Sequence, residues 1–287
     1  MRVRVFPLLW LLTATLAAAD LARLENAIQL FRNEKLVEAK TAFEKLVAAE
    51  PDNAEANYWL GRTAVAIKDP EGAVHYLEKA VALDATRARY FHFLGDAYGL
   101  SIPKAGLFAK LDLAQKCIAA YDRAVALDPE DVSARRSRYE YFLQAPPMAG
   151  GGHDKAAAEA AEIEKRDPVL GASLRADLCA KENRVDEAFS IQTDLLHHHP
   201  DSKIAQFYFG RLVAMNARQL DEGEAALKSY LSYTPTEDEP PLWSAHWRLA
   251  QILEAKGNST AARIEYEQTL KLNPAWDRAR AALKRLN

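Results

Sequence analysis

A spaced pattern of small and apolar residues returns seven times along this 287-residue chain and constrains its fold more than any other feature. In each copy a small residue is followed seven positions later by an apolar or small residue. Five positions further on stands a proline, once replaced by alanine. The copies are Ala39/Leu46/Pro51, Ala73/Ala80/Ala85, Cys117/Ala124/Pro129, Ala156/Ile163/Pro168, Ala188/Leu195/Pro200, Gly223/Tyr230/Pro235 and Ala262/Thr269/Pro274. A period of roughly 34 residues indicates a repeated pair of helices, numbered here as repeats one to seven.

A further small position lies twelve residues before the first member of several copies. It is occupied by Ala27, Gly61, Ala176 and Ala250. Small residues at these spacings let two helices approach closely, while larger apolar neighbours fill the adjoining groove. Proline at the end of each copy stops a helix. Because no segment shows sustained strand alternation, the sequence predicts an all-α fold.

Three segments carry a resemblance to a known repeat family. Trp59-Leu60-Gly61, the run from Phe91 to Tyr98, and the run from Trp247 to Leu253 followed by Gly257 are similar to the first helices of tetratricopeptide repeats. The resemblance covers residues 20–287. It implies a right-handed α-solenoid of about seven helix-turn-helix units. A closing helix from about Ala275 to Leu286 would cap the solenoid with exposed basic residues.

The repeat spacing fails at three places, which indicates insertions. From Gly95 to Cys117 there are 22 residues instead of 12, and from Tyr139 to Ala156 there are 17. The third insertion follows Pro235. We expect the first two to lie in the turns inside repeats three and four, over Gly99–Leu111 and Ala145–His153, side by side at one edge. Inserted turns often carry function, although many are surface loops without a role.

Residues 1–19 resemble a secretory signal peptide. Arg2 and Arg4 precede an apolar run that ends at Ala17-Ala18-Ala19, so cleavage is expected before Asp20. The expected location is therefore the bacterial periplasm or the exterior. The apolar run is shorter than a membrane span, and no later run approaches the required length of about 20 residues, so no membrane insertion is expected after cleavage.

Charge and cysteine content exclude some classes of function. Removing Arg2 and Arg4 from the 37 basic residues leaves 35 against 40 acidic residues, a net charge of −5, which argues against a nucleic-acid partner. Cys117 and Cys179 belong to repeats three and five, too far apart for a disulfide, and both occupy expected core positions.

Two motifs could hold a ligand. His197-His198-His199 ends a helix, but adjacent helical residues point about 100° apart, so an interaction with the helix C-terminus is the simpler reading. The Gly-rich run from Pro146 to Lys155 lacks a preceding strand and the Ser or Thr of a phosphate loop, so a flexible turn with Asp154 as N-cap is expected. No catalytic residue, metal site or cofactor is predicted. A periplasmic ligand- or metal-binding protein that uses these two motifs remains the alternative function.

The family resemblance implies that the first helix of each repeat lines a concave face where partners bind. The candidate partner-binding residues on that face are Tyr58, Arg62, His92, Asp96, Arg136, Glu140, Asp177, Phe207, Arg211 and Trp247, with Ser173 and Gln251 beside them. Aromatic and Arg residues are typical binding anchors, although each ring could instead pack between neighbouring repeats. We therefore expect a non-enzymatic scaffold or adaptor of the bacterial cell envelope that binds a protein or peptide.

Overall fold

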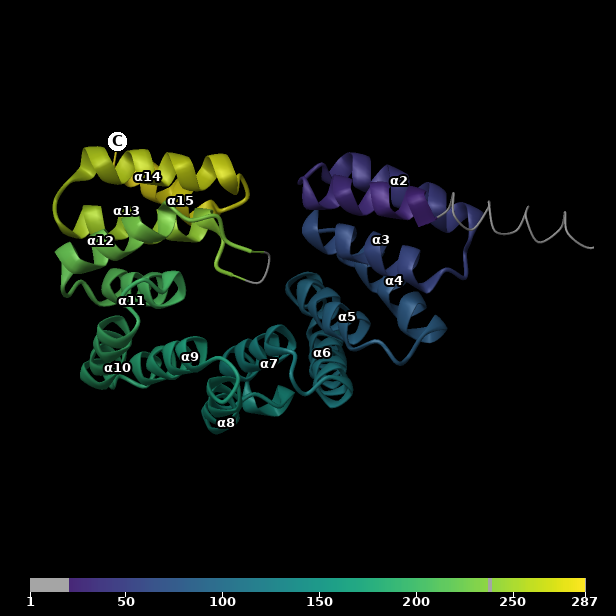
Figure 1. Cartoon of the computed structure of the whole chain (residues 1–287), viewed down its shortest axis with the longest axis horizontal. Helices are drawn as coiled ribbons and strands as arrows, with labels where there is room; N and C mark the ends of the chain where they lie inside the picture. The colour runs from purple at the N-terminus through teal and green to yellow at the C-terminus, as the bar shows by residue number, and fades with distance from the viewer. Residues whose placement is uncertain (1–20, 237–238, 287) are drawn as a thin grey trace, which may run out of the picture. The chain divides into compact units, whose positions relative to one another are not determined.

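The computed structural model describes residues 21–236 and 239–286, all of it helices and connections without a strand (Figure 1). The expected signal peptide lies outside these residues. Residues 21–32 are helical. The helices that follow are α2 (Leu36–Ala49), α3 (Ala54–Ala66), α4 (Pro70–Leu83), α5 (Ala88–Ser101), η1 (Ile102–Lys104), α6 (Leu107–Leu127), α7 (Val132–Gln144), η2 (Pro147–Ala149), α8 (His153–Glu164), α9 (Pro168–Lys181), α10 (Val185–His198), α11 (Lys203–Asn216), α12 (Leu220–Leu231), α13 (Leu242–Ala255), α14 (Ser259–Leu272) and α15 (Asp277–Arg285). The predicted all-α fold class is confirmed.

The chain divides into two compact units, with the boundary between Gly151 and Gly152. The N-terminal unit holds residues 21–32 with α2, then the pairs α3/α4 and α5/α6, and finally α7. The C-terminal unit begins with α8, continues with the pairs α9/α10, α11/α12 and α13/α14, and ends with α15. In each unit a helix packs against its successor, and first helices of neighbouring pairs also touch, as α3 touches α5 and α11 touches α13. Stacked helix pairs of this kind form an α-solenoid within each unit.

Short polar side chains begin many of the helices. The side chain of the N-cap residue accepts a hydrogen bond from the backbone N–H three positions later in α3, α4, α7, α9, α11 and α14; these caps are Asn53, Asp69, Asp131, Asp167, Ser202 and Asn258. Each cap satisfies one of the backbone donors that a helix start leaves unpaired. The sequence therefore sets the helix boundaries locally, before any packing is considered.

Small residues lie where paired helices come closest. A Cβ on Gly61 of α3 would lie 2.5 Å from Cγ of Leu77 on α4, and a Cβ on Gly95 of α5 would lie 2.4 Å from the Tyr121 ring on α6. Ala73 and Ala80 of α4 are completely buried. The spacing that identified the repeats is thus the spacing of helix–helix contact.

Two expectations about the insertions need correction. The first inserted segment is not a turn throughout, because α6 has 21 residues and begins at Leu107. Leu107–Leu113 contains good helix formers without Gly or Pro, and Leu113 packs against the core, so these residues extend the helix at its start. In the second segment α8 begins at His153 after Gly152, so Asp154 lies in the first turn and is not the N-cap.

Candidate functional site

The two inserted segments of the N-terminal unit lie near one another, as the repeat spacing predicted. Together they line one pocket, which the spacing did not predict. The pocket has a volume of about 730 Å³ and lies between α5, α6, α7 and η2. Its walls include Leu107 and Leu111 from the first inserted segment and Pro146 and Met148 from the second. The volume falls within the range of roughly 300–1,000 Å³ that is usual for ligand pockets.

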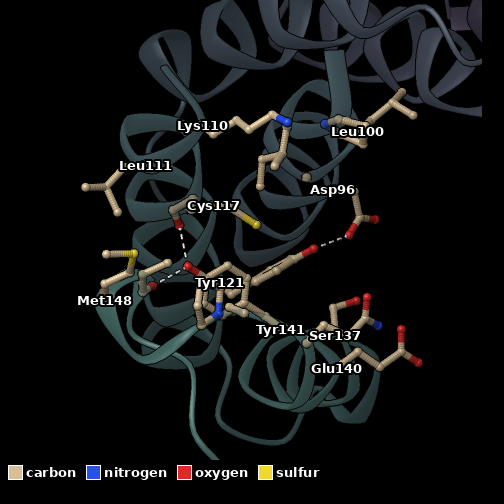
Figure 2. A pocket seen from close by; sticks show the side chains of 18 of the residues that line it. Asp96, Leu100, Lys110, Leu111, Cys117, Tyr121, Ser137, Glu140, Tyr141 and Met148 are labelled. Atoms are coloured by element: carbon tan, nitrogen blue, oxygen red, sulfur yellow. Dashed lines mark hydrogen bonds between the residues drawn. The ribbon is translucent and has the colours of Figure 1, made fainter. Parts of the chain in front are cut away.

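Tyr141 on α7 holds the second inserted segment against α6. Its hydroxyl lies 2.8 Å from the carbonyl oxygen of Ala114 and 2.5 Å from that of Ala149, so it can donate to either (Figure 2). The turn then folds back tightly, because a Cβ on Gly151 would lie 1.8 Å from the Ala145 carbonyl oxygen. Only glycine fits at this position. The Gly-rich run thus builds the pocket wall rather than an open phosphate loop.

The lining of the pocket includes a polar pair, the buried Tyr121 and the half-buried Asp96. The Tyr121 hydroxyl donates to Oδ1 of Asp96 at 2.7 Å. Burial raises the pKa of the Asp96 carboxyl, although the nearby His92, the hydrogen bond from Tyr121 and the charges of Arg62 and Arg136 act in the opposite direction. The Cys117 thiol donates to the Gly95 carbonyl oxygen at 3.2 Å, and burial raises its pKa to about 12. A thiol with this pKa stays protonated and is a poor nucleophile.

The rim of the pocket exposes large apolar side chains. Leu107 is 80% exposed, Met148 78%, and Phe108, beside Leu107, 92%. Figure 2 shows Leu111 and Met148 on one side of the pocket and Asp96 and Glu140 on the other. We call Leu107, Phe108, Leu111 and Met148 the apolar rim. Exposed apolar groups gathered around a cavity are typical of interaction sites.

Several candidate residues expected on an exposed face of the N-terminal unit are buried instead. Tyr58 is 2% exposed, and its ring stacks on that of Tyr90 with centroids 4.8 Å apart. The Arg62 guanidinium lies 4.1 Å from the centroid of the Phe93 ring, and Nε2 of His92 lies 2.9 Å from Oγ of Ser137. The expectation of exposure is wrong for Tyr58, Arg62 and His92, because their side chains fill the space between neighbouring repeats.

The other three candidates of this unit lie nearer the pocket. Asp96 is half-buried at the pocket floor, and Glu140 lines the wall. Nε of Arg136 lies 3.8 Å from a carboxylate oxygen of Glu140, one helical turn away on α7. Asp96 and Glu140 therefore share one site, and their role in partner binding stays a prediction.

In the C-terminal unit, Phe207 and Trp247 are 3% and 8% exposed, which contradicts their expected outward direction. The Phe207 ring packs on Tyr230 at 5.1 Å, and Trp247 packs on Tyr266 at 5.3 Å. These rings join neighbouring helices, so they belong to the core.

The polar candidates of the C-terminal unit are partly brought together. Nη2 of Arg211 lies 2.7 Å from Oδ2 of Asp177, a carboxylate that is itself 6% exposed. Ser173 is completely buried. Gln251 accepts a hydrogen bond from Nη1 of Arg248 at 2.9 Å. The pairing of Asp177 with Arg211 joins two repeats through α9 and α11.

The remaining motifs show no ligand geometry. The His198 ring lies 2.8 Å from the Asp194 carbonyl oxygen, so its Nδ1–H donates to the last turn of α10, which is the simpler role expected for this cluster. In the part of the chain that the structure describes, no three His, Cys, Asp or Glu side chains lie close enough to hold a metal ion. Within the same residues, no helix is both long and apolar enough to cross a bilayer.

The residues that the candidate list missed are the apolar rim and the pocket tyrosines Tyr121 and Tyr141. The insertions predicted where this edge lies, but not that its exposed side chains are apolar. The four apolar residues in the two inserted segments could have revealed the rim, since solvent-exposed turns are ordinarily polar. The pairing of Tyr141 with two distant carbonyl groups has no sequence signal.

Comparison with known proteins supports the repeat assignment. Residues 30–96 and residues 212–275 match models of the tetratricopeptide repeat. The chain resembles a tetratricopeptide repeat protein from Parabacteroides merdae, with a TM-score of 0.64, 14% identity, and coverage of 94% of this chain and 99% of that one. Comparison with curated proteins finds no match.

Two further solved structures share the fold. Yeast Tom70 has a TM-score of 0.60 and 16% identity over 88% of this chain and 51% of its own. The APC/C hetero-tetramer Cut9–Hcn1 gives a TM-score of 0.54 and 12% identity over 91% of this chain and 48% of that one. At these identities the likeness is one of fold alone. The matched segments show tetratricopeptide repeats in both units, on helices that are paired and stacked as described.

Proposed function

We propose that this protein is a non-enzymatic scaffold of the bacterial cell envelope whose partner protein docks at the pocket of the N-terminal unit. The tetratricopeptide repeat fold supports a protein–protein interaction scaffold. The observation that carries the docking site is the apolar rim around a pocket of about 730 Å³. Exposed side chains such as Phe108 lose contact with water when a partner covers them, which stabilises the complex.

The pocket chemistry describes the partner segment that fits it. Apolar side chains of the partner enter beside Leu111 and Met148, where the lining is apolar. Donor groups of the same segment lie opposite Asp96 and Glu140, whose carboxylates accept hydrogen bonds. One or two apolar anchors in a pocket, flanked by polar contacts, supply most of the binding energy of typical interfaces.

The envelope location rests on the N-terminal pattern alone. Arg2 and Arg4, the apolar run and Ala17-Ala18-Ala19 form the sequence of a cleavable export signal. An exported scaffold would meet its partner outside the cytoplasm. In that oxidising location, burial would protect the Cys117 thiol from oxidation.

Site-specific photo-crosslinking in cells tests the proposed docking site. A photoreactive phenylalanine derivative at position 108 should crosslink one partner protein. The same derivative at position 264 of α14, where Ile264 is 52% exposed, should not. Equal crosslinking of the same protein from both positions, or none from position 108, would contradict docking at the apolar rim.

A further inference from the structure

Outside the pocket, the C-terminal unit gathers three cationic side chains around one carboxylate, with a fourth near one of the three. The carboxylate is Asp177 on α9, paired with Arg211 on α11. The positive charges of Lys181 and Arg248 also act on Asp177, and that of Arg278 acts on Arg248. The cluster therefore carries more positive than negative charge, with contributions from α9, α11, α13 and α15.

The guanidinium of Arg248 has no carboxylate hydrogen-bonded to it among the described residues. Its Nη1 donates to the neutral side-chain oxygen of Gln251, and its buried Nε finds no hydrogen-bond acceptor among the described residues. Burial, with the positive charges of Arg211 and Arg278 and against the opposing charge of Asp177, lowers the pKa of Arg248 to about 10. Guanidinium groups normally keep their charge because a carboxylate or phosphate lies against them.

A cavity adjoins the cluster. Gln251 and Arg278 line a pocket of about 610 Å³ between α11, α13, α14 and α15. Trp247, Glu254 and Arg285 line the same pocket, where the charges of Glu254 and Arg285 are paired with each other at 2.6 Å. Arg248 donates to Gln251, so its guanidinium contacts a residue of the pocket lining. The pocket leaves room for a ligand beside Gln251 and Arg278.

We propose that Arg248, Arg278 and Gln251 form a binding site for a phosphate group in the C-terminal unit. Arginine forks and an amide N–H are the donors that phosphate oxygens accept, and a dianion compensates the excess charge better than a carboxylate does. The site is separate from the proposed docking pocket and does not depend on it. Free phosphate and a phosphate monoester share this chemistry.

Thermal melts and calorimetric titrations of the full chain test the site. Inorganic phosphate and glycerol 3-phosphate are compared with sodium acetate at equal ionic strength. Phosphate should raise the melting temperature in proportion to the logarithm of its concentration. A larger effect of glycerol 3-phosphate than of inorganic phosphate would identify a monoester as the ligand, and the reverse would identify free phosphate. An equal shift with acetate would overturn the proposal, because it would show only general charge screening.

Two substitutions and a matched control locate the binding. Arg248→Gln and Arg278→Gln should each weaken phosphate binding about tenfold or more, since each removes charged donors. The control is Arg280→Gln. Arg280 lies on α15, as Arg278 does, but it is exposed and paired with Asp277, so this variant should bind phosphate as wild type does. Without phosphate, Arg248→Gln should melt at or above the wild-type temperature, because it relieves repulsion within the cluster.

Two results would contradict a phosphate site at Arg248 and Arg278. If Arg248 has only a structural role, Arg248→Gln melts lower while phosphate binding survives in Arg278→Gln. Because Arg278 is exposed, Arg278→Gln provides a folded protein even if Arg248→Gln does not fold. Unchanged phosphate affinity in Arg278→Gln overturns the proposal.

Discussion

The Tyr121 hydroxyl donates a hydrogen bond to Asp96 at 2.7 Å and so joins α6 to α5 at the floor of the pocket. Burial raises the pKa of Asp96 above its ordinary value of 3.8, and burial followed by the Asp96 charge raises that of Tyr121 well above 10.0. Gly95, next to Asp96, lets the Tyr121 ring approach the backbone of α5. The hydrogen bond between Tyr121 and Asp96 therefore depends on the close contact that Gly95 allows between α5 and α6.

This pair predicts a pH-dependent stability. Between pH 3.8 and the raised pKa, folded Asp96 holds a proton that the unfolded chain has released, so the free energy of unfolding falls as pH rises through this window. In Asp96→Asn this contribution is absent. The melting temperature of wild type relative to Asp96→Asn should therefore fall as the pH rises above about 4.

The control is Asp112→Asn, which changes a carboxylate with a 62% exposed side chain on α6. Its melting temperature should stay at a nearly constant offset from wild type over the same range. A constant offset for Asp96→Asn as well would show that the pKa of Asp96 is not raised by folding.

Two phenylalanines, one buried and one exposed, allow the contribution of burial to stability to be compared. Phe207→Ala should lower the free energy of unfolding by about 3–5 kcal/mol, because Phe207 is 3% exposed and its loss opens a cavity beside Tyr230. Phe108→Ala should change it by less than about 0.5 kcal/mol, since that ring is 92% exposed. Chemical denaturation measures both. Comparable losses would mean that Phe108 packs against the protein in solution.

Gly61 tests the contact between α3 and α4. Gly61→Leu should cost about 1–3 kcal/mol through overpacking, because even its Cβ would meet Leu77 at 2.5 Å. Gly99→Ala on α5 meets only the Cys117 sulfur at 3.8 Å, and should stabilise the helix by about 0.5–1 kcal/mol. Thermal melts compare the two. An unchanged midpoint for Gly61→Leu would rule out this close packing.

The fold was predicted well from the sequence because the spacing of small residues follows the positions at which paired helices touch. Gly61 and Gly95 lie at helix contacts because only small residues fit there. The number of residues from each glycine to the next small position identifies the two helices that pair. The helix extension at Leu107 was missed because an insertion in spacing does not say whether added residues are helical. The beginning of the helix depends on Gly106 and on the packing of Leu113.

The candidate site was predicted less well, since side-chain direction depends on neighbouring repeats. Phe207 and Trp247 have the expected helical positions, yet the next helix covers them. Asp96 and Glu140 lie in the same pocket, which sequence spacing alone could not show because an insertion separates them. The repeat register predicted that both inserted segments lie at one edge, but not that they form a pocket there.

Export predicts a processed N-terminus. Protein recovered from the periplasm should begin at Asp20, because Ala17 and Ala19 present the small side chains that signal peptidase accepts. Intact-mass measurement of the fractionated protein determines this. Protein that retains Met1 and fractionates with the cytoplasm would contradict the envelope location while leaving the fold and the pocket unaffected.

Affinity for the crosslinked partner tests the docking site most directly. The pocket variant Leu107→Ser/Phe108→Ser/Met148→Ser is compared with Val37→Ser/Ile264→Ser/Leu272→Ser, which changes three exposed apolar residues elsewhere. Calorimetric titration with the purified partner should give a Kd about tenfold or more weaker for the pocket variant, and a wild-type Kd for the control. A wild-type Kd for a folded pocket variant would contradict partner binding at the apolar rim.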